Sequence, residues 1–249
     1  MSVERQRHRS PDTAAAACAR RMVTALSEAL RSGGPTTLAL SGGSTPLLLF
    51  DALARIEFDW SGVHLFQVDE RAVPPSDAQS NYREIAERFI APARFPQKNV
   101  HRIMAELEPA KAAARYEAEI REFFAIKAPE LPHFDIVHLG IGADAHTASL
   151  FPGEALIEER ERLVASVHVP KLGQDRITLL AGPLLAARSV VFLIAGREKA
   201  NAVFNTLYGP DDHRRFPAQL IARRGRRVIC YMDDDAGFDI KWEGVHAAP

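Results

Sequence analysis

The stretch FDIVHLGIGADAHTASLFPG, residues 134–153, decides the fold that we expect for this chain. Its opening FDIVHL is a mostly apolar run, which is typical of a strand buried in a parallel sheet. The glycines that follow allow the backbone to turn sharply or to approach a ligand closely. Asp144 and His146 arrive on this turn, with Thr147 and Ser149 behind them. In open α/β folds ligands bind at the carboxyl ends of the strands, so these groups predict acid–base chemistry there.

Segments with strand-like and helix-like patterns alternate on both sides of this stretch, and that alternation predicts a parallel sheet. We expect strands at 36–41, 63–70, 134–139, 163–169, 176–180, 189–196 and 226–232. We expect helices at 12–32 (capped by Asp12), 46–55, 80–90, from Pro109 onward, and at 197–209. No repeat or flexible linker divides the sequence. It therefore predicts a single α/β domain over residues 1–249, with residues 1–11 as a flexible leader and Trp242 anchoring a polar tail.

Composition excludes several classes of protein. The 249 residues carry a formal net charge of -1, and 47% of them are hydrophobic, close to the globular average. A chain without a basic excess is not expected to bind nucleic acid or a membrane surface. Cys18 and Cys230 lack the spacing of a zinc site, and no apolar run is long enough to span a membrane. We therefore expect a cytoplasmic protein with reduced thiols and no metal.

The loop SGGSTP, Ser41 to Pro46, joins a predicted strand to a predicted helix. Its small residues free backbone N–H groups, and the helix N-terminus adds a positive dipole, so the loop is suited to bind an anion. It has no Walker-type lysine, which argues against a nucleoside triphosphate. The alternative is a plain glycine-rich turn in which Ser44 or Thr45 caps the helix.

Charged residues provide two further candidate sites. Asp69, Glu70 and Arg71 end a hydrophobic strand, where a charge needs a partner or a ligand unless the run is simply solvated. Lys199 opens a helix, where a cation opposes the helix dipole and suggests a nearby anion. Lys171 and Arg176 are further scattered cations, and Arg176 opens a predicted strand. The alternative for Lys199 is a solvated lysine in the first turn of the helix.

Two other patterns carry less weight. GIGADA, residues 140–145, matches the dinucleotide pattern G-x-G-x-x-A, but LFPG interrupts the helix which that pattern needs, so NAD is not expected. His138 lies inside the FDIVHL strand, and we expect it to be a packed, hydrogen-bonded core residue.

In this order the motifs resemble the 6-phosphogluconolactonase family over about residues 38–221. The shared motifs are SGGSTP, VDERAVP followed by SNY, GxGxDxHTASLFPG, RIT, a strand ending in GxxK, and PAQLI. The resemblance implies a three-layer α/β/α sandwich with a mainly parallel central sheet, Rossmann-like and related to sugar-phosphate isomerases. It also implies hydrolysis of a small phosphosugar lactone, 6-phospho-D-glucono-1,5-lactone, in the oxidative pentose phosphate pathway. No cofactor is implied, and we expect a monomer or a small homo-oligomer.

The resemblance also suggests roles for individual residues. His146 would be the general base, which suits an imidazole near neutral pH. Arg71 is the candidate to stabilise the oxyanion. Either Asp69 or Asp144 could orient the imidazole, and family analogy favours Asp69. The phosphate is expected near Gly43, Ser44, Thr45, Arg176 and Lys199, with Ser41, Gly42, Asn81, Gly142 and Asp144 in support.

The chain departs from the family pattern at Ala145, where relatives usually carry glycine. If that position requires a positive φ, alanine strains the turn by roughly 1 kcal/mol. His138 also stands where relatives commonly have an apolar residue.

Two other functions are weighed against lactone hydrolysis. A glucosamine-6-phosphate deaminase/isomerase-like enzyme shares the glycine turn, but such enzymes continue with an Asn-Glu-Pro-Gly type ending where this chain has SLFPG. A non-catalytic sugar-phosphate sensor would carry a helix-turn-helix domain, and the sequence before residue 36 leaves no room for one.

Overall fold

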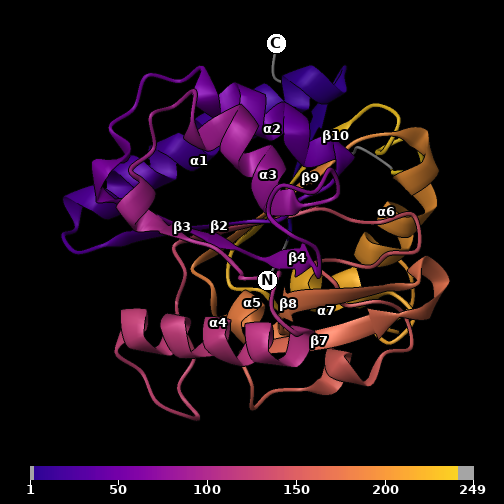
Figure 1. The fold of residues 1–249 in the computed structure, drawn as a ribbon. Helices are drawn as coiled ribbons and strands as arrows, with labels where there is room; N and C mark the ends of the chain where they lie inside the picture. The colour runs from indigo at the N-terminus through magenta and orange to yellow at the C-terminus, as the bar shows by residue number, and fades with distance from the viewer. Residues whose placement is uncertain (1–2, 241–249) are drawn as a thin grey trace.

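The fold is a three-layer α/β/α sandwich, as the sequence predicts. The computed structural model describes residues 3–240, and helices cover both faces of a seven-stranded sheet (Figure 1). The strand order is β1-β10-β9-β6-β2-β3-β5, and every neighbouring pair is parallel. The strands are β1 (Glu4–His8), β2 (Thr36–Leu40), β3 (Val63–Gln67), β5 (Val100–His101), β6 (Ile136–Leu139), β9 (Ser189–Ile194) and β10 (Val228–Asp233).

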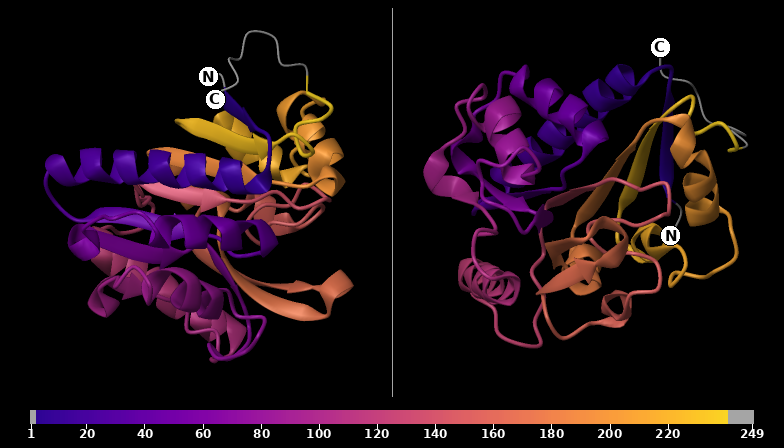
Figure 2. Two further views of the ribbon diagram at one scale, coloured as in Figure 1. Left: turned by 90° about the horizontal axis from the view of Figure 1, so that it is seen from above. Right: turned by 45° about the vertical axis from the view of Figure 1, so that its right-hand side comes forward.

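The helices divide between the two faces of this sheet, as Figure 2 also shows. One face is covered by α1 (Pro11–Arg31), α2 (Ser44–Ala54) and α3 (Asn81–Ile85), which continues as a π-helical turn over Ala86–Ile90. The other face is covered by α4 (Pro109–Phe124), α5 (Ala181–Ala186), α6 (Ala200–Leu207) and α7 (Pro217–Arg224). Short 3-10 turns lie at Trp60–Gly62, Gln97–Asn99, Ala155–Glu158, Pro170–Leu172 and Arg197–Lys199. Within residues 3–240, none of the helices has the length and apolar character needed to cross a membrane.

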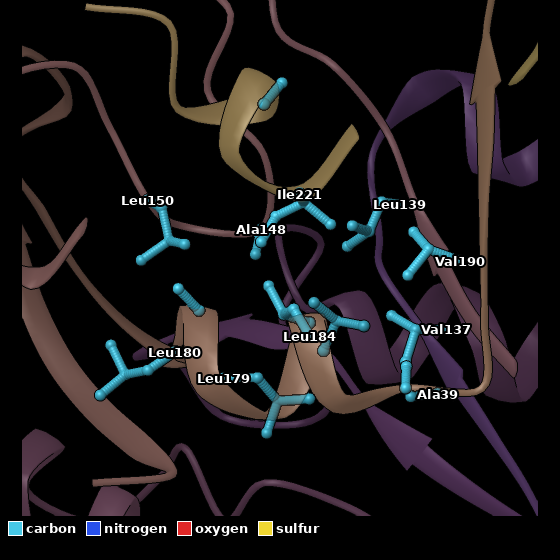
Figure 3. Packing of buried hydrophobic residues seen from close by; sticks show 14 of the residues in the cluster. Ala39, Val137, Leu139, Ala148, Leu150, Leu179, Leu180, Leu184, Val190 and Ile221 are labelled. Carbon is cyan, nitrogen blue, oxygen red and sulfur yellow. The ribbon is translucent and has the colours of Figure 1, made fainter. Parts of the chain in front are cut away.

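Each central strand is apolar at consecutive positions because both of its faces are buried. Side chains of a strand alternate between the faces. Thus Leu38 and Leu40 join the core under α1 and α2, while Ala39 joins the core under α4 to α7. Figure 3 shows this second core, in which Val137 and Leu139 of β6 lie near Leu184 of α5.

His138 lies on the other face of β6, and only half of the prediction for it holds. Its side chain is fully buried, with Leu40 of β2 and Val191 of β9 as its strand neighbours. Neither ring nitrogen has a hydrogen-bond partner in the part of the chain that the structure describes. The imidazole is therefore packed, but it is not hydrogen-bonded.

A second, smaller sheet was not predicted. It is antiparallel, with the order β4-β8-β7, and contains β4 (Asp69–Arg71), β7 (Val164–Val169) and β8 (Gln174–Leu179). The prediction of one strand over 63–70 is wrong, because the chain changes sheets at Val68. Its N–H still donates to Leu40 O of the main sheet (2.9 Å), while its carbonyl accepts from Leu179 N of the small sheet (2.7 Å). This crossover carries Asp69 and Arg71 away from the main sheet toward the β7–β8 hairpin.

The prediction of a flexible leader over residues 1–11 is also wrong. Strand β1 pairs in parallel with β10 and forms one edge of the main sheet. Ser10, and not Asp12, caps α1: Thr13 N donates to Ser10 Oγ (3.3 Å), and Ser10 N donates to Thr13 Oγ1 (3.1 Å). Trp242 lies outside the described residues.

Candidate active site

A cavity of about 310 Å³ lies where the loops after β2, β4 and β6 meet the tip of the β7–β8 hairpin. This is the carboxyl edge of the parallel strands, where α/β folds bind ligands. The cavity is lined by every predicted site residue except Asp144: Ser41, Gly42, Gly43, Ser44, Thr45, Asp69, Arg71, Asn81, Gly142, His146, Arg176 and Lys199. A larger cavity of about 750 Å³ lies at the amino ends of the strands and contains none of them. We therefore place the candidate site in the smaller cavity.

His146 is held by a tight turn after β6. Gly142 N donates to His146 O (3.0 Å), and Ala145 N donates to Gly142 O (2.8 Å). Thr147 Oγ1 closes the turn with a hydrogen bond to Gly140 O (2.9 Å). Asp144 stands two residues before His146, so its Oδ1 reaches both the His146 backbone N (3.2 Å) and the ring Nδ1 (2.5 Å). The turn itself thus supplies the imidazole with its carboxylate partner.

The structure corrects the prediction that Asp69 orients His146. Asp69 is buried, and its two carboxylate oxygens accept hydrogen bonds from Ser41 Oγ (2.9 Å) and Ser149 Oγ (2.8 Å). Asp144 occupies the orienting position instead. The motifs alone leave both carboxylates open, and the two-residue spacing between Asp144 and His146 places Asp144 against the ring.

The Asp144 carboxylate is ionised in this arrangement. Burial acts to raise the pKa of Asp144, but the hydrogen bonds from His146 and Lys171 outweigh burial and hold the pKa well below its ordinary value. A carboxylate can only accept hydrogen bonds, so it assigns the imidazole proton to Nδ1. The other ring nitrogen, Nε2, is then left with a lone pair that can accept a proton.

Gly142 is required by the close approach of the imidazole. A Cβ at this position would lie 2.1 Å from His146 Nδ1 and 2.8 Å from Asp144 Oδ1, distances that real side chains do not tolerate. By contrast, a Cβ at Gly140, two residues earlier, would meet nothing within 4 Å.

Ala145 adopts the positive φ for which glycine is better suited. Its φ is 64°, in the left-handed region, where a residue with a Cβ is strained by about 1–2 kcal/mol. Its methyl group is fully buried in the core beneath the turn, which returns about 0.8 kcal/mol. Its carbonyl accepts a hydrogen bond from Ala218 N (3.0 Å). The burial of the methyl group therefore offsets a large part of the strain, and the turn keeps its shape with alanine.

Cations line the opposite wall of the cavity. Arg71 and Arg176 are register neighbours across β4 and β8, and the buried Nε of each has no hydrogen-bond partner within residues 3–240. Burial lowers the pKa of Arg176, and the nearby Asp69 charge only partly opposes this effect. Burial likewise lowers the pKa of Lys199, whose Nζ donates to Thr45 Oγ1 (2.8 Å). A bound anion would stabilise all of these groups.

The SGGSTP loop faces these cations from the N-terminus of α2. Gly43 is the N-cap, with a φ of 118°, and no side chain caps the helix. The alternative of a Ser44 or Thr45 cap is therefore wrong. The first-turn N–H groups stay free of a side-chain cap, which favours an anion at this end of the helix. Gly42 packs against Asn81, since a Cβ at Gly42 would lie 2.0 Å from Asn81 Oδ1.

Glu70 is buried outside the cavity, although it stands between two residues that line it. Its carboxylate accepts hydrogen bonds from the backbone N of Arg71 (2.8 Å), Asn81 (2.7 Å) and Tyr82 (2.7 Å). The side chains of Gln67 and Ser80 donate to it as well. Glu70 thus fixes the loop that positions Arg71 and Asn81, and its own charge is satisfied inside the protein.

Seven residues of the cavity wall were not predicted as site residues: Pro46, Gly140, Ile141, Ala148, Phe151, Lys171 and Leu172. The sequence marked Lys171 only as one of several scattered cations, and the PKLG segment of the hairpin gave no further signal. Across residues 3–240, no group of three or more His, Cys, Asp or Glu side chains is arranged to hold a metal ion.

Known proteins share both the sequence pattern and the fold. The family model for glucosamine-6-phosphate isomerases/6-phosphogluconolactonase matches residues 9–230. A 6-phosphogluconolactonase from a Synechocystis species is 36% identical over 222 residues, which cover 88% of this chain and 91% of the relative.

Solved structures agree with this result. The crystal structure of 6-phosphogluconolactonase from Thermotoga maritima has a TM-score of 0.79 and 29% identity, and the match covers 92% of this chain and 100% of that one. A monomeric glucosamine-6-phosphate deaminase has a TM-score of 0.81 but only 19% identity over 95% of this chain and 99% of its own, so that likeness shows the fold alone. From its motifs, its fold and these matches, the chain belongs to the glucosamine-6-phosphate isomerase/6-phosphogluconolactonase family.

Proposed function

We propose that the protein hydrolyses 6-phospho-D-glucono-1,5-lactone to 6-phospho-D-gluconate, the lactonase step of the oxidative pentose phosphate pathway. The observation that carries the proposal is one cavity that combines an oriented imidazole with Arg71 and Arg176, whose buried Nε atoms have no hydrogen-bond partner within residues 3–240. The Synechocystis and Thermotoga relatives are named for this activity. The buried free thiols Cys18 and Cys230 fit a reducing compartment, and we propose the cytoplasm.

In the proposed reaction His146 acts first as a base and then as an acid. Its Nε2 removes a proton from water, and the water oxygen forms a bond to the lactone carbonyl carbon. The carbonyl electron pair moves onto oxygen, where Arg71 stabilises the negative charge. When the carbonyl re-forms, the bond to the ring oxygen breaks, and the imidazolium returns its proton to that oxygen. Asp144 stabilises the imidazolium between the two steps through Nδ1.

The cations around the SGGSTP loop are proposed to bind the substrate phosphate. Arg176 has a free Nε and a guanidinium that can bind a phosphate with two parallel hydrogen bonds. Lys199 and Thr45 already lie together, 2.8 Å apart. Ser44 and the N-terminus of α2 add donors on the other side.

Replacing Arg176 with methionine is expected to raise KM for the phosphorylated lactone by about tenfold or more, because a charge-assisted hydrogen bond contributes about 1.5–3 kcal/mol. Unphosphorylated glucono-1,5-lactone should be turned over at a nearly unchanged, low rate, because it has no phosphate group for Arg176 to bind. Steady-state kinetics with both lactones measures the difference. Arg115→Met, at an exposed position of α4, is the matched control. An equal loss of activity on both lactones would show that Arg176 does not bind the phosphate.

Replacing Gly142 with alanine is expected to lower kcat/KM by about 100-fold, because the new Cβ must push the imidazole away from its reacting position. Gly140→Ala makes the same chemical change in the same turn where a Cβ has open space, so it should keep nearly all activity. Comparing the two variants in the lactonase assay, with thermal unfolding as a check on folding, measures the effect. If both lose activity alike, the turn is sensitive to any alanine and the imidazole contact is not the cause.

The proposed function is tested by generating the lactone in situ and following its conversion to 6-phosphogluconate. The spontaneous opening of the lactone must be subtracted. The enzyme should exceed that background by orders of magnitude and release no ammonia from glucosamine 6-phosphate. Ammonia release would favour the deaminase function. Tight binding of 6-phosphogluconate without turnover would favour the sensor function.

A further inference from the structure

Lys171 reaches into the active site from the tip of the β7–β8 hairpin. Its Nζ forms an ion pair with Asp144 Oδ2, the oxygen that does not bind the imidazole. The same Nζ lies 4.7 Å from the centre of the Phe151 ring, within the range of a cation–π contact. The side chain is 51% exposed, so these two contacts, and not burial, hold it at the cavity.

Phe151 links this lysine back to the imidazole. Its ring centre lies 4.5 Å from that of His146, and the two planes are tilted by 33°. Val167 and Val169 of β7 pack against Phe151 in a small core separate from the two main ones. The four side chains therefore form a closed ring of contacts, from Lys171 to Asp144, His146, Phe151 and back.

We propose that Lys171 is a positioning residue: it holds Asp144 in place against His146 and shares the carboxylate charge with the imidazole. The inference rests on the proposed function, in which His146 is the base. A carboxylate paired with the imidazole alone would strongly stabilise the protonated ring. The ammonium on the second oxygen draws on the same carboxylate charge and weakens that stabilisation.

Other charged groups face the same cavity. Arg71 of β4, Arg176 of β8 and Lys199 of the turn before α6 are cations that also disfavour a protonated imidazole. The carboxylate of Asp69 is engaged by two serine hydroxyls. All of these groups remain when Lys171 alone is changed, so a difference between variant and wild type reports on the lysine.

Replacing Lys171 with methionine should move the acidic limb of the kcat/KM–pH profile upward by about one pH unit. Lys171→Arg keeps the cation and should restore most of the wild-type profile. Lys111→Met removes a lysine from an exposed position of α4 and should leave the profile unchanged. A rise in KM with an unmoved acidic limb would overturn the proposal, because it would make Lys171 a substrate-binding group.

A second readout does not depend on turnover. The His146 ring resonances, assigned by their loss in His146→Gln, are followed by NMR as the pH is varied. In Lys171→Met the midpoint of this titration should move upward by about one pH unit. If wild type hydrolyses no lactone, the proposed function fails, yet this titration still tests the lysine. An unchanged midpoint overturns the inference whether or not the protein is a lactonase.

Discussion

Replacing His146 with alanine is expected to lower kcat/KM for the phosphorylated lactone by about a thousandfold, close to the spontaneous rate of ring opening. The reason is that water is a poor nucleophile until a base removes its proton, and His146 is the oriented imidazole of the cavity. The substitution leaves Arg176 and Lys199, the cations proposed to bind the phosphate, unchanged. The affinity for 6-phosphogluconate should therefore change by less than about threefold.

The measurement compares initial rates in the in situ assay with product binding by calorimetry. His133→Ala is the matched control, because His133 lines the other cavity at the amino ends of the strands. A variant that keeps more than about a tenth of wild-type activity would remove His146 from the role of general base. A loss of both activity and product binding would point to a collapsed site, and circular dichroism then separates misfolding from a lost base.

The sequence predicts the central sheet well because each inner strand of the sheet is recognisable from its own apolar residues. Segments such as VVFLI, residues 190–194 of β9, are buried on both faces and therefore apolar at every position. The polar edge strand β1, with the sequence ERQRH, has no such pattern, since its side chains are only partly covered. Its place is set by hydrogen bonds to β10, which are contacts between distant parts of the chain.

The order of the motifs predicts which residues gather at the site, but not the contacts between them. Motifs at the ends of parallel strands are bound to meet at one edge of the sheet, and that rule gathers His146, Arg71 and Lys199. The same rule does not tell whether Asp69 or Asp144 faces the His146 ring. Asp69 turns toward two serines because the chain changes sheets at Val68, a step that the continuous strand-like pattern of residues 63–70 does not reveal. The position of Lys171 at the cavity likewise depends on how the β7–β8 hairpin folds, which the sequence does not reveal.

Replacing His138 with leucine is expected to stabilise the protein, and the gain should grow as the pH falls. The wild-type ring is buried without a hydrogen bond, and a polar group buried in this way costs about 1–3 kcal/mol. Leucine has a similar volume and suits the apolar neighbours Leu40 and Val191, so most of that cost should be recovered at pH 7.

The pH dependence follows from the buried ring. Burial lowers the pKa of His138 to about 3, far below its ordinary value of 6.5 in the unfolded chain. Between these pKa values the unfolded state binds a proton at His138 and the folded state does not. The free energy of unfolding of wild type therefore falls as the pH drops below 6.5. From pH 7 to pH 5 this linkage costs wild type about 2 kcal/mol, and His138→Leu should escape that cost.

Urea unfolding of both proteins at pH 7 and at pH 5 measures this difference, with His133→Leu as a control that removes an exposed histidine. The gap between His138→Leu and wild type should widen by about 2 kcal/mol at the lower pH, while the control follows wild type. A constant gap would mean that the folded protein protonates His138 or supplies it with a partner. Activity should survive the change, because His138 does not line the cavity and leucine keeps the backbone carbonyl that accepts from Ser41 N (3.3 Å) at the start of the SGGSTP loop.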